Sequence, residues 1–155
     1  MRRLFSCIII LSLLSIASHS FGATGRVIKV LPHFLDSKGR AALSPSLYDR
    51  DAYQVILRDH PEKRSGIRFD MQWKTKGTLW SDLKLRVELR GVAQGESPKQ
   101  MILEQDLQRG GWFSHWTSMT LAGEEYKTIG EVTAWRVTLW DGEHLLGEQK
   151  SFLWQ

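Results

Sequence analysis

Two tryptophans in the segment GGWFSHW, Trp112 and Trp116, have the clearest potential to bind a ligand. They are four residues apart, so on an extended strand they project from one face about 13 Å apart. Flat rings at that spacing can stack on an extended sugar chain or on an apolar patch of a protein partner. The alternative is core packing, because Gly110 and Gly111 can bend the chain and a neighbouring helix or loop can cover the rings.

The residues around these tryptophans indicate which way the strand faces. If the strand is regular, its two faces alternate residue by residue. The face opposite the tryptophans ends in two apolar residues and is expected to point into the core; it comprises Phe113, His115, Thr117, Met119 and Leu121. The tryptophans are then expected to point outward.

Residue patterns typical of enzymes are missing from the chain. There is no GxSxG, HExxH, P-loop or GxGxxG motif. The histidines beyond residue 22 are not spaced as a local metal pair, and LDSKGR lacks the ligand spacing of a calcium loop; these histidines are His33, His60, His115 and His144. We therefore predict no catalytic residue, no metal and no cofactor. A small hydrolase is the enzymatic alternative, and it would need two carboxylates converging in a cleft.

The N-terminus has the layout of a secretory signal peptide. A cationic MRR precedes the apolar run LFSCIIILSLLSIA and the small-residue exit SHSFGA. The apolar run is shorter than the roughly 20 residues that a membrane-spanning helix requires. We predict cleavage after Gly22, which gives a signal peptide at 1–22 and one mature domain at 23–155. The protein is then secreted or periplasmic, and an uncleaved membrane anchor is the alternative.

Removal of residues 1–22 changes the chemistry of the chain. The single cysteine, Cys7, is lost, so the mature domain has no disulfide and must rely on its hydrophobic core. The formal net charge is +4, and the loss of Arg2 and Arg3 without any acidic residue lowers it by two. This nearly balanced charge argues against a nucleic-acid partner.

Alternating polarity predicts two half-buried strands in the middle of the chain. In GIRFDMQWK the apolar residues are Ile67, Phe69, Met71 and Trp73, and polar residues stand between them. LKLRVELRG repeats the pattern with Leu83, Leu85, Val87 and Leu89. Such alternation is typical of antiparallel sheets with one buried and one solvated face.

Further strands are predicted on either side of these two. EVTAWRVTLW and HLLGEQKSFLW flank Asp141-Gly142, a strong hairpin-turn signal, and Gly147 is expected to mark a bulge. Weaker strands are expected at 26–31, 100–107 and 112–121. The total of seven short strands favours a sandwich or barrel.

One segment, SPSLYDRDAYQVILRDHP, has helical rather than strand periodicity. Ser44 is placed as an N-cap, Pro45 as the first helical residue and Pro61 as the terminator. The predicted helix covers about 45–59. Its expected core face comprises Tyr48, Ala52, Val55 and Ile56. Residues 31–46 are expected to form a loop, and the adjacent Glu124 and Glu125 in AGEEYK a solvated turn.

The strand count and the terminal hairpin resemble an immunoglobulin or fibronectin type III-like domain over about residues 26–155. The resemblance implies an all-β, seven-stranded antiparallel β-sandwich with one short helix between the first two strands. The chain lacks the Cys…Trp…Cys framework of true immunoglobulin domains. Residues 43–74 also look like the N-terminal part of small exported bacterial proteins of unknown function, which supports export.

Taken together, these features predict an exported, non-enzymatic binding module. Its expected partner is another envelope or secreted protein, without a membrane span in the mature chain. The alternative is a carbohydrate-binding module that uses Trp112 and Trp116 to hold a glycan.

Overall fold

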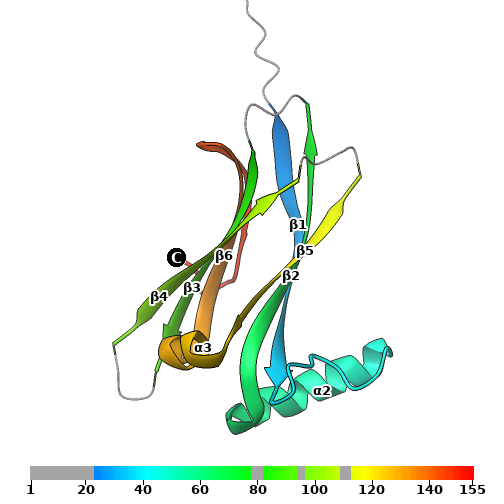
Figure 1. Cartoon of the computed structure of the whole chain (residues 1–155), viewed down its shortest axis with the longest axis vertical. Helices are drawn as coiled ribbons and strands as arrows, with labels where there is room; N and C mark the ends of the chain where they lie inside the picture. Colours follow the sequence, from blue (N-terminus) through cyan, green and yellow to red (C-terminus); the bar gives the residue numbers. More distant parts are fainter. Residues whose placement is uncertain (1–22, 78–81, 94–96, 109–112) are drawn as a thin grey trace, which may run out of the picture.

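The structure of the protein is a computed structural model that describes residues 23–77, 82–93, 97–108 and 113–155 (Figure 1). The predicted signal peptide lies outside these residues. The elements in chain order are β1 (Thr24–Asp36), α2 (Leu47–Asp59), η1 (Pro61–Lys63), β2 (Arg64–Lys76), β3 (Leu83–Val92), β4 (Lys99–Leu107), β5 (His115–Ala122), α3 (Gly123–Ile129), β6 (Glu131–Asp141) and β7 (His144–Lys150). None of the helices in this part of the chain has the length and apolar character needed to cross a membrane.

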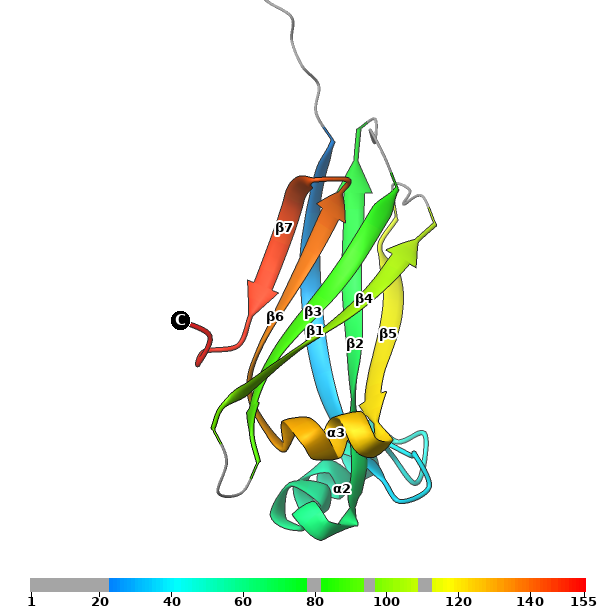
Figure 2. The same ribbon diagram turned by 60° about the vertical axis from the view of Figure 1, so that its left-hand side comes forward.

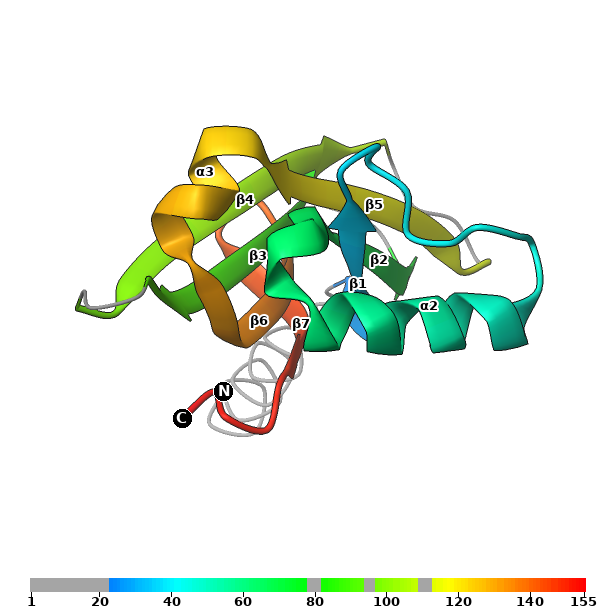
Figure 3. The ribbon, with the colours of Figure 1, turned by 90° about the horizontal axis from the view of Figure 1, so that it is seen from below.

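The strands form two antiparallel sheets. One sheet has the order β1-β2-β5, and the other has the order β4-β3-β6-β7. Figures 1 and 2 show the sheets facing each other along their length. Both helices lie at the same end of the sheets (Figure 3). The prediction of a mostly β chain with seven antiparallel strands is therefore confirmed for the described residues.

The core lies between the two sheets and is built by the alternating strands. The predicted apolar residues of β2 and β3 are all buried: Ile67, Phe69, Met71, Trp73, Leu83, Leu85, Val87 and Leu89. They form one hydrophobic cluster with residues of β1, β5, α3 and β6. Burial of each such side chain contributes about 1.5–3 kcal/mol, so this cluster is the main stabilising feature of a domain without disulfide bonds.

The predicted terminal hairpin is present, with a tight turn and a bulge. Asp141 pairs with His144, and Gly142 between them has a φ of 57°, a conformation that favours glycine. Leu139 pairs with Gly147 and Trp140 with Leu145, which leaves one extra residue in β7 next to the glycine. The last strand ends at Lys150 rather than at the end of the chain.

Two strand boundaries differ from the prediction. β1 runs from Thr24 to Asp36, so residues 31–36 of the expected loop are strand. The reason is that β1 pairs with β2 along its whole length, from Thr24↔Lys76 to Asp36↔Arg64. β5 begins at His115, and the expected start at Trp112 lies outside the described residues.

The helix α2 begins two residues later than predicted, at Leu47. Its N-cap is Ser46, whose hydroxyl accepts a hydrogen bond from the backbone N–H of Asp49 at 3.4 Å. Ser44, the predicted N-cap, instead donates to the carboxylate of Asp49 at 2.6 Å. Pro45 therefore precedes the cap and is not the first helical residue.

The predicted core face of α2 is wrong. Tyr48, Val55 and Ile56 are 83%, 49% and 46% exposed, and the buried residues are Gln54 and Leu57. The physical reason is that the helix does not cover a sheet face with an apolar stripe. It crosses the end of β1 (Figure 1), where the Gln54 side chain bonds to the backbone of Phe34 and Leu57 is the one apolar residue of the helix that is fully buried.

The second helix, α3, replaces a predicted turn. Its N-terminal glycine has a φ of 63°, and its last residue, Ile129, is completely buried. Tyr126 packs against the core cluster from the same helix. Glu124 and Glu125 lie in the first turn and are exposed, so both carboxylates are solvated as expected.

Candidate functional site

Trp116 lies in β5 on the outer face of the β1-β2-β5 sheet. Met119 and Leu121 of the same strand are buried, whereas Trp116 is 53% exposed. The predicted alternation therefore holds along β5, and this indole points away from the core. Trp112, the other predicted ligand-binding residue, lies outside the described residues.

The neighbours of Trp116 form a short polar row across the sheet. Gln72 of β2 is the direct cross-strand partner of Trp116, and Lys29 of β1 is the partner of Gln72. Side chains at directly opposed positions share a face. The Gln72 amide donates to the hydroxyl of Ser114 at 3.0 Å, which fixes the amide beside the indole position.

Asp70 organises the centre of the same face. Its carboxylate accepts hydrogen bonds from the Ser118 hydroxyl at 2.6 Å and from the Arg68 guanidinium at 3.0 Å. Burial opposes ionisation most strongly, but the bonds from Ser118 and Arg68 outweigh it and lower the pKa of Asp70. The carboxylate is therefore charged at neutral pH and holds β2 and β5 side chains in place.

His33 of β1 contacts the same carboxylate. The His33 Nδ1 atom is 3.1 Å from Asp70 Oδ2, and because an ionised carboxylate only accepts, Nδ1 carries the proton. Burial, assisted by the charge of Arg50, lowers the pKa of His33 despite the opposing effect of Asp70. His33 is thus a neutral side chain that supports the sheet face, and the described residues contain no group of three His, Cys, Asp or Glu able to hold a metal.

Trp73 shows the contrast between a structural tryptophan and Trp116. It is buried on the inner face, its indole N–H donates to Thr117 at 2.9 Å, and its ring stacks on His115 at 4.9 Å. This agrees with its predicted place at the end of the apolar face of β2. Trp116 has the opposite orientation, with its indole on the outer face of the sheet.

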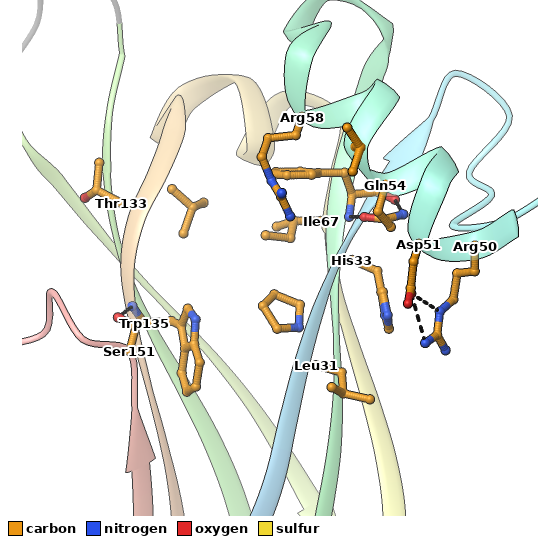
Figure 4. Close-up of a pocket in the computed structure, with 14 residues that line it drawn as sticks. Leu31, His33, Arg50, Asp51, Gln54, Arg58, Ile67, Thr133, Trp135 and Ser151 are labelled. Atoms are coloured by element: carbon orange, nitrogen blue, oxygen red, sulfur yellow. Dashed lines mark hydrogen bonds and ion pairs between the residues drawn. The ribbon is translucent and has the colours of Figure 1, made fainter. Parts of the chain in front are cut away.

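A groove that sequence reasoning missed lies between β1, α2 and β6. It has a volume of about 630 Å³, within the size range of ligand-binding clefts. Figure 4 shows Arg58 of α2 reaching into it, with Trp135 of β6 on the far side and His33 beside β1. Its floor is mostly apolar, formed by Leu31, Pro32, Ile67, Val132 and Trp135.

No local pattern in the sequence marks this groove. Its residues come from five separate segments, and the space exists because β7 ends at Lys150 while β6 continues beyond it. The one available signal was the basic Arg58 on a helix whose other face was expected to be buried. Sequence reasoning could not separate that residue from an ordinary solvated arginine.

Comparisons with protein-family models, with curated proteins and with solved structures found no match to this chain. The class of protein therefore rests on the sheet topology, on the outer face around Trp116 and on the groove between β1, α2 and β6.

Proposed function

We propose that the chain is an exported, non-enzymatic binding module with an immunoglobulin- or fibronectin type III-like β-sandwich fold. Strand order supports this fold: the third, sixth and seventh strands share one sheet, and the first, second and fifth share the other. The fourth strand lies beside the third, which differs from constant-type immunoglobulin domains, where it lies beside the fifth.

Export is supported by residues 1–22, with their cationic start, short apolar run and small-residue exit. The test is the mass of the protein recovered from the periplasm or medium. A product beginning at Ala23 agrees with cleavage after Gly22. Recovery of the intact chain in the membrane fraction contradicts it.

The binding surface that we propose is the Trp116 face, defined as the outward side chains of Lys29, Asp70, Gln72, Trp116 and Ser118. The observation that carries it is the half-exposed indole of Trp116 on a regular strand. Large aromatic side chains are enriched among the residues that dominate protein interfaces. The hydrogen bonds of Asp70 and Gln72 already fix the surroundings of the ring, so little side-chain ordering is required on binding.

The first candidate partner is another protein of the cell envelope or the secreted fraction. Trp116 supplies an exposed apolar centre, and the charged Asp70 carboxylate nearby already has hydrogen-bond partners within the chain. An apolar centre with a polar rim is the usual composition of a protein interface. Phe113, which was expected to point into the core, is instead 82% exposed and gives a second exposed aromatic side chain three residues before Trp116.

The second candidate is a glycan, held by Trp116 together with Trp112. A flat exposed ring with an amide beside it is the combination that sugar recognition requires, because the ring stacks on the apolar face and the amide bonds hydroxyls. The Gln72 amide adjacent to the position of Trp116 is the observation that favours this alternative.

One set of variants separates the candidates. Purified wild-type, Trp116→Ala and Trp140→Ala proteins are immobilised and exposed to a native envelope extract and to soluble polysaccharides. Trp140 is a matched control because it is a partly exposed tryptophan on the other sheet, where its ring packs near Arg86. Bound proteins are identified by mass spectrometry, and bound sugars by affinity electrophoresis.

The protein candidate predicts a partner that is retained by wild-type and Trp140→Ala but lost by Trp116→Ala. The glycan candidate predicts the same loss for a polysaccharide, and a further loss in Trp112→Ala. Equal retention by Trp116→Ala and wild-type in both arms contradicts the proposed surface. Turnover of a substrate by the mature chain contradicts the non-enzymatic proposal.

A further inference from the structure

β1 of one sheet and β6 of the other face each other across a boundary, which we call the seam. β7 covers this seam over only part of its length. Near the start of β1 the backbones of β1 and β7 approach closely, since a Cβ at Gly147 would lie 2.7 Å from Arg26 Cα (Figure 2). β7 pairs with β6 from Asp141 to Arg136, and Ser151 N–H then donates to Trp135 O at 2.9 Å. The chain turns away there, so residues 131–134 of β6 have no strand neighbour on this side within the described residues.

The opposite wall of the seam, the edge of β1, is already protected. Pro32 has no backbone N–H to offer a partner. The Gln54 side chain accepts from the Phe34 N–H at 2.8 Å and donates to the Phe34 carbonyl at 3.0 Å. An incoming extended segment would therefore find its backbone partner on β6 and only side-chain contacts on β1.

The groove defined above occupies this open part of the seam. Its apolar residues include Val132 and Trp135 of β6 and Val55 of α2. Arg58 points into the groove (Figure 4), and no described residue pairs with its guanidinium. Arg50, the other cation at the groove, is matched by Asp51 at 3.3 Å, so Arg58 supplies the unbalanced positive charge.

Arg58 lies at the end of the groove towards which β7 runs. The guanidinium of Arg64 donates to the Arg58 carbonyl and also pairs with Glu131, the first residue of β6. A segment that continues the direction of β7 along β6 therefore runs towards Arg58 and ends there. Ser151 closes the other end of the groove. The next two residues, Phe152 and Leu153, are 95% and 62% exposed and add apolar surface after it.

We propose that this groove binds the extended C-terminal tail of a partner protein, with apolar side chains on Val132 and Trp135 and the terminal carboxylate at Arg58. The tail runs antiparallel to β6, in line with β7. Thr133 is the extra residue of a β6 bulge, so backbone pairing covers few residues and the carboxylate contributes much of the affinity. The groove shares no residue with the Trp116 face, although its His33 is bonded to Asp70 of that face, and the two proposals are tested by different variants.

The test uses two libraries of N-acetylated hexapeptides drawn from Val, Ile, Leu, Thr and Phe, one with free carboxylates and one with C-terminal amides. Binding to the ¹⁵N-labelled mature chain is followed by NMR at the Trp135 indole N–H and the Arg58 Nε–H. The variants are Arg58→Gln and, as a matched charge control, Lys29→Gln. Arg58→Gln is expected to fold normally because its guanidinium makes no hydrogen bond or ion pair with the described residues.

The expected result is that the free-acid library shifts both groove signals and binds about tenfold more tightly than the amide library. Arg58→Gln removes that preference, whereas Lys29→Gln and Trp116→Ala retain it. Absence of groove shifts at millimolar free-acid peptide overturns the proposal, as does equal binding of acid and amide. Binding of hexanoate as tight as that of the peptides assigns the groove to a small acid and also overturns it.

Discussion

Arg64 and Glu131 form an ion pair of 2.6 Å between the first residue of β2 and the first residue of β6, and so join the two sheets. The Arg64 guanidinium also donates to the carbonyls of Leu57 and Arg58 at the end of α2 and lies over the Phe34 ring at 3.9 Å. One side chain therefore connects a helix end to both sheets.

The two partners of this pair are expected to respond differently to substitution. The Arg64 side chain is 2% exposed, and that of Glu131 is 54% exposed. Arg64→Met leaves two carbonyls without their donor and is expected to cost about 2–4 kcal/mol of unfolding free energy. Glu131→Gln is expected to cost less than about 1 kcal/mol. Urea unfolding measures both, and similar losses for the two variants contradict a central role of Arg64.

Asp36 at the end of β1 predicts a specific acid dependence of stability. The buried carboxylate accepts hydrogen bonds from Tyr53 at 2.8 Å, from the Arg40 side chain at 2.9 Å and from the Lys38 backbone at 2.8 Å. Burial alone would raise the pKa of Asp36, but these bonds outweigh it and lower that pKa far below its ordinary value. The stabilisation is therefore complete above the unfolded pKa of about 3.9 and is lost as the pH falls below it.

Asp36→Asn is expected to be less stable than wild-type at pH 7 and to lose less free energy of unfolding between about pH 5 and pH 2. Asp70 contributes a slope of the same sign in both proteins, so the comparison isolates Asp36. Urea unfolding at a series of pH values measures the difference. Parallel curves for the two proteins contradict the assignment.

Gly147 is predicted to be required by close packing and not by its conformation. An alanine Cβ there would lie 2.7 Å from Arg26 Cα and 3.0 Å from the Gly25 carbonyl oxygen, so β1 and β7 must separate. Gly39 offers the contrast, because its φ of 74° strains alanine but its surroundings are open. Gly147→Ala is expected to cost about 2–3 kcal/mol, and Gly39→Ala about 1 kcal/mol, in thermal unfolding. A larger loss of stability in Gly39→Ala than in Gly147→Ala contradicts the close packing of β1 against β7.

Trp154 is predicted to fix the end of the chain on the outer face of the β4-β3-β6-β7 sheet. Its ring lies 4.2 Å from the Arg90 guanidinium and 5.4 Å from that of Arg136. Trp154→Ala is expected to cost about 1 kcal/mol and to speed amide exchange at residues 151–155. Phe152→Ala, at a 95% exposed position, is the control and should change neither. Equal effects of the two substitutions contradict the contact.

The strands were predictable because each one carries its own face pattern. Ile67, Phe69 and Met71 alternate with polar residues, and any antiparallel pairing that buries one face must bury all three. The outward direction of Trp116 followed from the same alternation, with Met119 and Leu121 defining the inner face of β5. Local periodicity therefore gave both the sheet content and the orientation of one candidate residue.

The helices and the groove depend on long-range contacts that no local pattern contains. Tyr48, Val55 and Ile56 have helical spacing, yet the contact with β1 is made by the polar Gln54. Arg58 acquires its place in a groove only because β7 stops short of the start of β6. Such features arise from how elements end and meet, and they become visible only in the folded chain.

The most direct test of the account is a binding isotherm for the partner captured from the envelope, measured with wild-type, Trp116→Ala and Trp140→Ala proteins. A half-exposed indole at the centre of an interface predicts at least about tenfold weaker binding for Trp116→Ala and unchanged binding for Trp140→Ala. Unchanged affinity in Trp116→Ala, with the fold intact by circular dichroism, would contradict the account.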